Sequence, residues 1–216
     1  LTPFTEATVL DVGCGAGHAS FVAASRVKEV IAYDLSEKML ETVNQAARER
    51  GFGNLQTRQG FAESLPFEDE RFDIVISRYS AHHWQDVGLA LREIKRVLRP
   101  GGKAIMMDVM SPGNAVLDIW LQTIEALRDT SHVRNYSSGE WAAMFSEAGL
   151  LTASVVTDRL ELDYTSWIAR MRTPEALAKA IRQYQVSASQ SVQQYYELRE
   201  EGSFTTDTIM IEVYKP

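Results

Sequence analysis

The sequence of 216 residues contains a single cysteine, Cys14, and this scarcity limits its chemistry. One thiol cannot form an internal disulfide or a cysteine-based zinc cluster. We therefore expect no metal site and a reducing, cytoplasmic location. No apolar run reaches the roughly 18 residues that a membrane-spanning helix needs, and no signal peptide precedes the first predicted strand. The sequence thus indicates a protein without stable membrane insertion.

Positive charge is also scarce. The chain has 22 Lys and Arg against 29 Asp and Glu, a formal net charge of −7. Such a surface repels phosphates, which argues against a nucleic-acid partner and leaves a small molecule as the expected one. The length fits a single domain over residues 1–216. Because the chain opens at Leu1 rather than Met, we expect some natural N-terminal residues to be missing. The sequence does not indicate an oligomeric state.

Short apolar segments alternate with helical patterns along the chain. The segments that favour strands are Thr8–Val12, Glu29–Tyr33, Asn54–Gln59, Phe72–Ser77, Lys103–Val109, Thr152–Asp158 and Thr208–Tyr214. The segments that favour helices before the fifth strand are Ala19–Arg26, the stretch from Ser36 to Arg50, and the stretch from Asp86 to Leu98, which Pro100-Gly101-Gly102 should end. This spacing predicts an α/β fold with a Rossmann-like, seven-stranded, mostly parallel sheet.

Helical insertions are expected after strand five and before the last strand. The core then covers about 8–110 and 150–216, and the inserted elements, about 113–148 and 163–203, are candidates for a cover over the substrate. Three large aromatic side chains fall in these elements: Trp120, Trp141 and Trp167. Aromatic residues at helical spacing are more often core than binding site. The cationic segments 131–134 and 170–172 leave a mixed substrate pocket as the second interpretation.

A glycine-rich loop, Gly13-Cys14-Gly15-Ala16-Gly17-His18, separates the first strand from the first helix. Glycines there let the chain turn sharply and let backbone N–H groups approach a ligand, and the helix N-terminus favours a carboxylate. Dinucleotide-binding folds prefer G-x-G-x-x-G, but here the third glycine arrives one residue early. The acidic Asp11 would repel a pyrophosphate and suits a cofactor with an amino group and a sulfonium cation. It is equally compatible with a role in holding the loop.

Asp34 ends the second strand, where a carboxylate can accept hydrogen bonds from both hydroxyls of a ribose. This residue alone does not separate S-adenosylmethionine (SAM) from NAD. Leu35 and Met39 would then flank the adenine ring, although plain core packing explains them equally well. The loop after strand three, residues 59–67, can read the adenine edge through backbone groups.

Five segments together resemble the class I SAM-dependent methyltransferases: VLDVGCGAGH, AYDLS, GFAESLPF, FDIVISRYSAHHW and LREIKRVLRPGG. More narrowly they are similar to the type-11 branch, which includes ubiquinone and menaquinone C-methyltransferases, and within it to the YafE-type bacterial group. The resemblance extends from about Thr8 to the C-terminus, and it implies SAM as the cofactor and S-adenosylhomocysteine as its product.

The resemblance also implies roles for individual residues. Gly13, Gly15 and Gly17, with Ser77 and Arg78, should lie near the methionine end of SAM. Asp34 should hold the ribose, and Ala62 and Glu63 should lie beside the adenine; Asp11 and His18 belong to the same expected set. One departure concerns Phe61, because the family often has Asp there to bind the adenine amino group. Phe61 can stack on the ring instead, or Glu63 can substitute.

His82 and His83 follow strand four, where the family has its substrate-facing loop. An imidazole there can accept a proton from a phenol or an acidic C–H group, so both are candidate catalytic residues. Backbone hydrogen bonding or partial solvent exposure is the alternative. We therefore expect methyl transfer to a small organic acceptor, quinone-like or phenolic. A SAM-binding protein without methyl transfer is the second hypothesis, and the glycine spacing disfavours a nicotinamide-dependent oxidoreductase.

Overall fold

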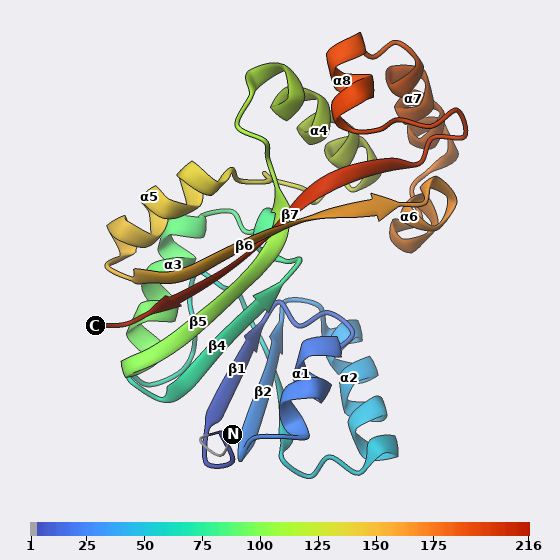
Figure 1. Cartoon of the computed structure of the whole chain (residues 1–216). Coiled ribbons are helices and arrows are strands. Elements are labelled where there is room, and N and C mark those ends of the chain that lie inside the picture. Colours follow the sequence, from blue (N-terminus) through green and yellow to red (C-terminus); the bar gives the residue numbers. More distant parts are fainter. Residues whose placement is uncertain (1–3) are drawn as a thin grey trace. The chain divides into compact units, whose positions relative to one another are not determined.

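The structure is a computed structural model that describes residues 4–216, and its elements are labelled in Figure 1. Seven strands form one sheet in the order β3-β2-β1-β4-β5-β7-β6. They are β1 (Thr8–Val12), β2 (Glu29–Asp34), β3 (Leu55–Gln59), β4 (Phe72–Arg78), β5 (Leu98–Met110), β6 (Leu151–Leu162) and β7 (Phe204–Tyr214). The β1–β2, β1–β4, β2–β3 and β4–β5 pairs are parallel. The predicted fold class is confirmed.

The helices follow the predicted pattern closely. They are α1 (His18–Ala24), α2 (Glu37–Arg50), the 3₁₀ helix η1 (Ala81–His83), α3 (Val87–Val97), α4 (Ala115–Arg128), α5 (Ser138–Ala148), α6 (Tyr164–Met171), α7 (Glu175–Val186) and α8 (Gln190–Tyr195). Ser36 and Asp86 cap α2 and α3 as expected, since their side chains accept backbone N–H groups. No helix in residues 4–216 has the length and apolar character to cross a membrane.

The start of β5 differs from the prediction. Pro100-Gly101-Gly102 lies inside the strand instead of before it, and α3 already ends at Val97. Phe72 pairs with Leu98 and Ile74 with Lys103, so five steps along β5 match two along β4. The extra residues form a bulge that the left-handed Gly101 (φ 75°) accommodates. Thr173 precedes Pro174 at the start of α7, a sequence typical of a helix cap, but its hydroxyl donates to the carbonyl of Arg128 instead.

The described chain divides into two compact units. Unit 1 holds the described residues up to Asp108, together with Ala142–Val155 and Met210–Pro216. Unit 2 holds Val109–Trp141 and Val156–Ile209. Most of the predicted helical insertions fall in unit 2, although the greater part of α5 belongs to unit 1. The expectation drawn from Leu1 lies outside the described residues.

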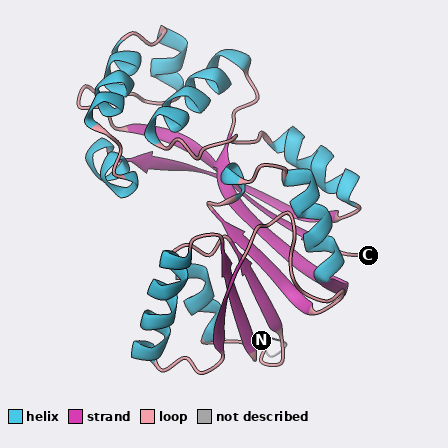
Figure 2. Cartoon of the chain, turned by 180° about the vertical axis from the view of Figure 1, so that it is seen from behind, coloured by secondary structure: helices cyan, strands magenta, loops and turns pink. Residues whose placement is uncertain are grey.

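In unit 1 the two faces of the sheet are covered by different helices. One face presents Val30 and Ala32 to Phe21 of α1 and Val43 of α2. Strand residues alternate between faces, so Tyr33 points to the other side. Figure 2 shows the helices and strands from behind. On its inner side α3 carries four fully buried residues: Ala90, Leu91, Ile94 and Val97.

Arg96 on α3 corrects one interpretation of the sequence. Lys95, Arg96 and Arg99 look like a solvated basic face, but the Arg96 guanidinium donates to the carbonyls of Phe67 (2.7 Å) and Leu65 (2.8 Å). It also pairs with Glu93 at 2.7 Å. Arg96 therefore anchors the loop after β3 to α3. Arg96 is thus part of the internal packing, whereas Arg99 of the same cluster is exposed.

Unit 2 has its own apolar core, in which Trp120 and Trp167 are 3% and 1% exposed. Trp120 lies 4.5 Å from Tyr196, and Trp167 lies edge-on to Phe204 at 5.1 Å, measured between ring centroids. These tryptophans are core residues, which is the commoner of the two interpretations of aromatic residues at helical spacing. Trp120 and Trp167 therefore do not line the mixed substrate pocket that was the second interpretation of the sequence.

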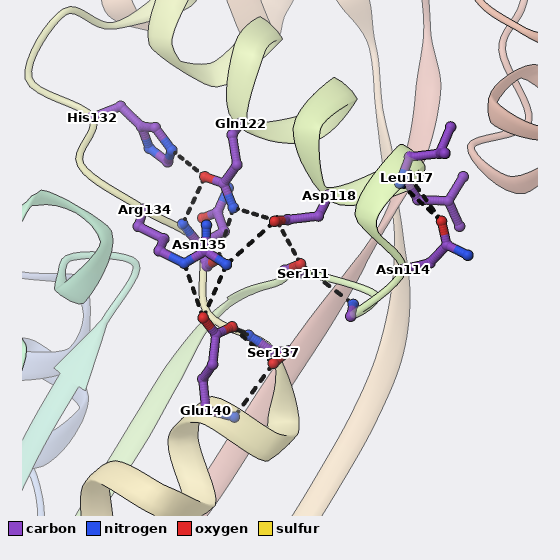
Figure 3. Close-up of polar contacts among 12 residues, drawn as sticks. Ser111, Asn114, Leu117, Asp118, Gln122, His132, Arg134, Asn135, Ser137 and Glu140 are labelled. Carbon is purple, nitrogen blue, oxygen red and sulfur yellow. Dashed lines mark hydrogen bonds and ion pairs between the residues drawn. The ribbon is translucent and has the colours of Figure 1, made fainter.

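A polar network holds the segment after α4 within unit 2 (Figure 3). The side-chain amide of Gln122 is at its centre. Its oxygen accepts the N–H of Asn135 (3.0 Å) and lies 2.9 Å from Nε2 of His132. Its nitrogen donates to the carbonyl of Asn135 and to the carboxylate of Asp118, both at 2.8 Å. Because Asn135 is 1% exposed, water does not replace these bonds.

Arg134 belongs to the same network. Its guanidinium lies 3.2 Å from the Asp118 carboxylate and 2.9 Å from that of Glu140. Glu140 in turn accepts the N–H and the hydroxyl of Ser137, both at 2.8 Å, which forms the capping box that the spacing of these two residues indicates for α5. The cation expected for a substrate pocket in segment 131–134 is therefore paired with two carboxylates.

Replacing Gln122 with Ala should lower the free energy of unfolding by about 2–3 kcal/mol, because the buried N–H and C=O of Asn135 lose their partners. Urea unfolding of the whole chain measures the change. Thr123→Ala is the matched control: the Thr123 hydroxyl bonds only the carbonyl of Ile119 in its own helix, and its loss should cost less than 1 kcal/mol. Equal losses in the two variants would contradict the role given to the amide.

Candidate cofactor and acceptor site

The loop between β1 and α1 is shaped by three left-handed glycines. Gly13, Gly15 and Gly17 have φ angles of 70°, 51° and 82°. L-residues with a side chain rarely adopt this region. At Gly13 there is a second reason, since a Cβ would lie 1.7 Å from Oγ of Ser80. Gly15 has open space around the same position. The first glycine is thus required by both conformation and close packing.

Tyr33 of β2 fixes two loops at once. Its carbonyl accepts the N–H groups of Gly13 (2.8 Å) and Cys14 (3.1 Å). Its hydroxyl donates to the carbonyl of Phe61 at 3.0 Å, and a Cβ on Gly60 would lie 2.0 Å from that hydroxyl. Burial raises the pKa of Tyr33 to about 12, so the hydroxyl keeps its proton and remains a donor.

Asp34 comes next on β2 and is half-buried. One carboxylate oxygen accepts the N–H of Gly15 and the other accepts the N–H of Ser36, both at 2.8 Å. A carboxylate offers about four acceptor positions, so each oxygen retains capacity for a hydroxyl. This geometry fits the ribose-binding role that the resemblance implies, and it adds a second role: Asp34 holds the glycine loop in the ligand-free protein.

Asp11, 1% exposed, lies beneath this loop. One oxygen accepts the hydroxyl of Ser20 at 2.5 Å. The other, Oδ1, has no hydrogen-bond partner within the described part of the chain. Burial is the main reason that the pKa of Asp11 rises to about 6. An acceptor without a donor in a buried position suits a ligand that carries positive charge or N–H groups. The hydrogen-bond partner of Asp11, Ser20, belongs to α1 and not to the glycine loop.

Two other residues of the loop have clear environments. Cys14 is half-buried, and its burial raises the pKa of the thiol far above the ordinary value, so the thiol stays protonated. This agrees with the interpretation of Cys14 as a small residue in a turn. His18 is exposed and lines a surface groove with Phe21, Arg50 and Phe52. A contact of His18 with the cofactor stays a prediction.

Exposed apolar side chains surround the expected adenine position. Leu35, Met39 and Phe61 are 53%, 39% and 55% exposed. Large apolar groups left in water at the end of a sheet are suited to cover a flat ring. Ala62 is buried.

Glu63 has a structural role that its position in the sequence does not indicate. Its carboxylate accepts the N–H groups of Gln85 (2.8 Å) and Asp86 (3.2 Å), which fixes the approach to α3. Contacts of Glu63 and Ala62 with adenine stay predictions.

The loop after β4 begins with an unusual backbone. Tyr79 adopts φ 52° although it is not glycine, and its N–H donates to the carbonyl of Met107 at 2.8 Å. Such a conformation costs a non-glycine residue roughly 1–3 kcal/mol and is typical of functional sites. It turns the chain so that Ser80 packs on Gly13. Ser77 is buried, with a hydroxyl that has no partner in residues 4–216, and exposed Arg78 lies over the ring of Tyr79.

His82 is held by a carboxylate that sequence reasoning missed. Nδ1 of His82 lies 2.5 Å from Oδ1 of Asp108, and the His82 backbone N–H donates to Oδ2 at 3.3 Å. Asp108 lies near the end of β5 and is 4% exposed. The ring of His83 lies 4.2 Å from that of His82, centroid to centroid. In residues 4–216 no group of three or more His, Cys, Asp or Glu side chains is arranged to hold a metal.

Tyr33, Ser80 and Asp108 are thus additions to the predicted site. Each follows from strand position: Tyr33 precedes Asp34, Ser80 follows the end of β4, and Asp108 lies where β5 ends beside β4. A search for polar residues at every carboxyl strand end would have found Asp108 and Ser80. Tyr33 reads only as a buried aromatic residue.

Comparison with known proteins identifies the family. The uncharacterized protein YafE of Escherichia coli is 61% identical over 94% of this chain and 98% of its own length. A profile described as "Methyltransferase domain" matches residues 10–106, and a methyltransferase of Bacillus subtilis, YcgJ, is 43% identical. The chain belongs to the class I SAM-dependent methyltransferases.

Further relatives agree. The uncharacterized methyltransferase YcgJ of Bacillus subtilis is 43% identical over 82% of this chain and 70% of its own. Its crystal structure superposes with a TM-score of 0.94, covering 98% of this chain and 93% of YcgJ at 38% identity. The demethylmenaquinone methyltransferase of Chlorobaculum tepidum is 36% identical over 52% of this chain and 45% of its own length. These likenesses place this methyltransferase in the type-11 branch.

In this methyltransferase, Gly13→Ala should destabilise the ligand-free protein more than Gly15→Ala does. The left-handed φ should lower the free energy of unfolding of each variant by roughly 1 kcal/mol. Only Gly13→Ala also places a Cβ against Ser80. The double variant Gly13→Ala with Ser80→Gly should recover most of the difference, as measured by thermal or urea unfolding. Without that recovery, the contact with Ser80 would not be the cause.

Proposed function

We propose that this methyltransferase transfers the methyl group of SAM to a small organic acceptor of quinone-like or phenolic type, releasing S-adenosylhomocysteine. The observation that carries the proposal is the pairing of the left-handed glycine loop with the Asp34 carboxylate, which joins the ends of β1 and β2. We further propose a cytoplasmic location and no nucleic-acid partner, on the grounds of composition and a net charge of −7.

The residues present fit the cofactor. When bound, SAM supplies a methyl group activated by a sulfonium. Asp34 would accept the ribose hydroxyls, and Leu35, Met39 and Phe61 would cover the adenine. Asp11, buried with one oxygen that has no donor among residues 4–216, would meet the positive charge of the methionine end. Ser77, whose buried hydroxyl has no partner in the same described range, would offer a polar contact there, as would Arg78.

The acceptor class is supported by a relative's name. The demethylmenaquinone methyltransferase of C. tepidum shares 36% identity over about half of each chain. Since that match covers less than half of the relative, it supports an aromatic, oxygen-bearing acceptor and does not single out one compound. Fold alone does not fix the acceptor. An assay of methyl transfer is therefore needed to show whether carbon, oxygen or nitrogen of the acceptor is methylated.

Calorimetry with S-adenosylhomocysteine, SAM and NAD tests the cofactor. We expect micromolar binding of both adenosyl ligands and none of NAD. Asp34→Ala should weaken adenosyl binding by about 1.5–4 kcal/mol, because charge-assisted hydrogen bonds are lost. Glu41→Ala, which removes an exposed carboxylate from α2, is the control and should leave affinity unchanged. Unchanged affinity in the Asp34 variant, with intact folding, would exclude Asp34 from the site.

Methyl transfer itself is tested with radiolabelled SAM against separate panels of phenols, hydroquinones and amines. Label should appear in a phenol or hydroquinone product. If S-adenosylhomocysteine binds and no compound in any panel is labelled, the result contradicts methyl transfer and favours the alternative of a SAM-binding protein without transfer.

The pH dependence of binding tests Asp11. Its pKa of about 6 in the ligand-free protein means that the carboxylate loses its charge as the pH falls through 6. A ligand that needs the charged form should bind with constant affinity above pH 7 and progressively more weakly below pH 6, approaching tenfold per pH unit. Asp11→Asn should remove this slope in calorimetric titrations between pH 5 and pH 8. A slope that persists in the variant would assign it to another group.

A further inference from the structure

We propose that His82 is the base that takes the acceptor's proton and that Asp108 is the residue that positions it. The inference rests on the proposed function, since it concerns the acceptor end of the same methyl transfer. It goes further by naming the carboxylate that directs His82. It also restricts the acceptor to a molecule whose hydroxyl or C–H group must lose a proton.

The geometry places His82 against a buried carboxylate. The Asp108 carboxylate contacts His82 twice, once at the ring (Nδ1 to Oδ1, 2.5 Å) and once at the backbone N–H (3.3 Å). The side chains of the pair are 14% and 5% exposed. A two-point contact to one carboxylate fixes the position of the residue and the orientation of its ring.

The contact at Nδ1 decides which nitrogen acts. With the Nδ1 proton shared with Asp108, the neutral imidazole keeps its basic lone pair on Nε2. A carboxylate behind the ring also stabilises the imidazolium that forms when Nε2 takes a proton, directly or along a hydrogen bond. A histidine oriented by a carboxylate is a recurrent arrangement for proton abstraction, recognised by geometry and not by sequence order.

The pair lies at the reacting end of the cofactor loop. Arg78, the last residue of β4, pairs with Met107 of β5, so the loop that carries His82 starts beside Asp108, the next residue of β5. Two residues before His82, Ser80 packs directly on Gly13. Substrates of parallel sheets lie beyond these carboxyl ends. One short segment therefore links the glycine loop to the base.

The reaction step balances without a further reagent. Nε2 of His82 takes the proton of an aromatic hydroxyl, and the electron pair left on the acceptor becomes available at oxygen or at the ring carbon beside it. That pair forms a bond to the methyl carbon as the carbon–sulfur bond breaks, and the electrons of that bond stay on sulfur. For methylation at carbon, the ring C–H proton leaves to solvent as the ring regains aromaticity. The imidazolium, stabilised by Asp108, then returns its proton to solvent.

A graded set of acceptors separates this role from a structural one. The probes are phenols of increasing acidity, from unsubstituted phenol to nitrophenols that are already ionised at neutral pH. His82→Ala should slow transfer to the weakly acidic members by roughly 100-fold or more, the usual scale of general-base catalysis. It should slow transfer to the ionised members far less. Asp108→Asn should show the same dependence on acceptor acidity with a smaller loss of rate, and it should reduce kcat while changing KM little.

A control variant tests whether the effect is specific to His82 and Asp108. Asp73→Asn removes a carboxylate that binds Thr8 and Arg99 at the start of β1 and β4. It should cost stability without a dependence on acceptor acidity. Equal loss across all phenols in the His82 variant, or the acidity-dependent loss in His83→Ala instead, would overturn the inference.

Binding separates the two proposals. Calorimetry with S-adenosylhomocysteine is run on the wild type and on the His82 and Asp108 variants, where affinity should stay within threefold. If no phenol or hydroquinone is methylated while S-adenosylhomocysteine binds, the inference fails and cofactor use stands. If S-adenosylhomocysteine does not bind the wild type, the proposed function fails with it.

Discussion

The two hydrogen-bonding ends of Tyr33 set the arrangement on which the cofactor site depends. The carbonyl of this buried residue holds the glycine loop after β1, and its hydroxyl holds the loop after β3. The two loops that we propose to hold opposite ends of the cofactor are therefore tied to one position on β2. Loops carry binding groups best when a rigid element positions them, and here a single residue of the sheet connects the two.

Much of this arrangement could be predicted from the sequence because it depends on local chemistry. The glycine spacing, the caps Ser36 and Asp86, and the Ser137–Glu140 capping box require particular residues within a few positions of one another. All of them occur as predicted. The strands β1, β2 and β4 were likewise predictable, since buried parallel strands are short apolar runs between clear turns. Boundaries were less exact, as the early start of β5 demonstrates.

The remainder depends on contacts between residues far apart in the chain. Asp108 and His82 are 26 positions apart, and nothing in either segment indicates the other. Arg96 resembles a surface cation until its bonds to the carbonyls of the loop after β3 are seen. Strain at Tyr79 is equally invisible in the sequence, because it is imposed by neighbours that hold the chain in place. Long-range partners and strained backbone are tertiary properties.

The environment of Cys14 has a practical consequence. The only thiol of the chain is half-buried in the glycine loop, and burial together with the nearby charges of Asp11 and Asp34 keeps it in the unreactive protonated form. Alkylating reagents and oxidants act on thiolates. A new cysteine introduced on the surface would therefore react first. Fluorescent or spin labels can in this way be attached at one chosen position without first removing the native residue from the loop.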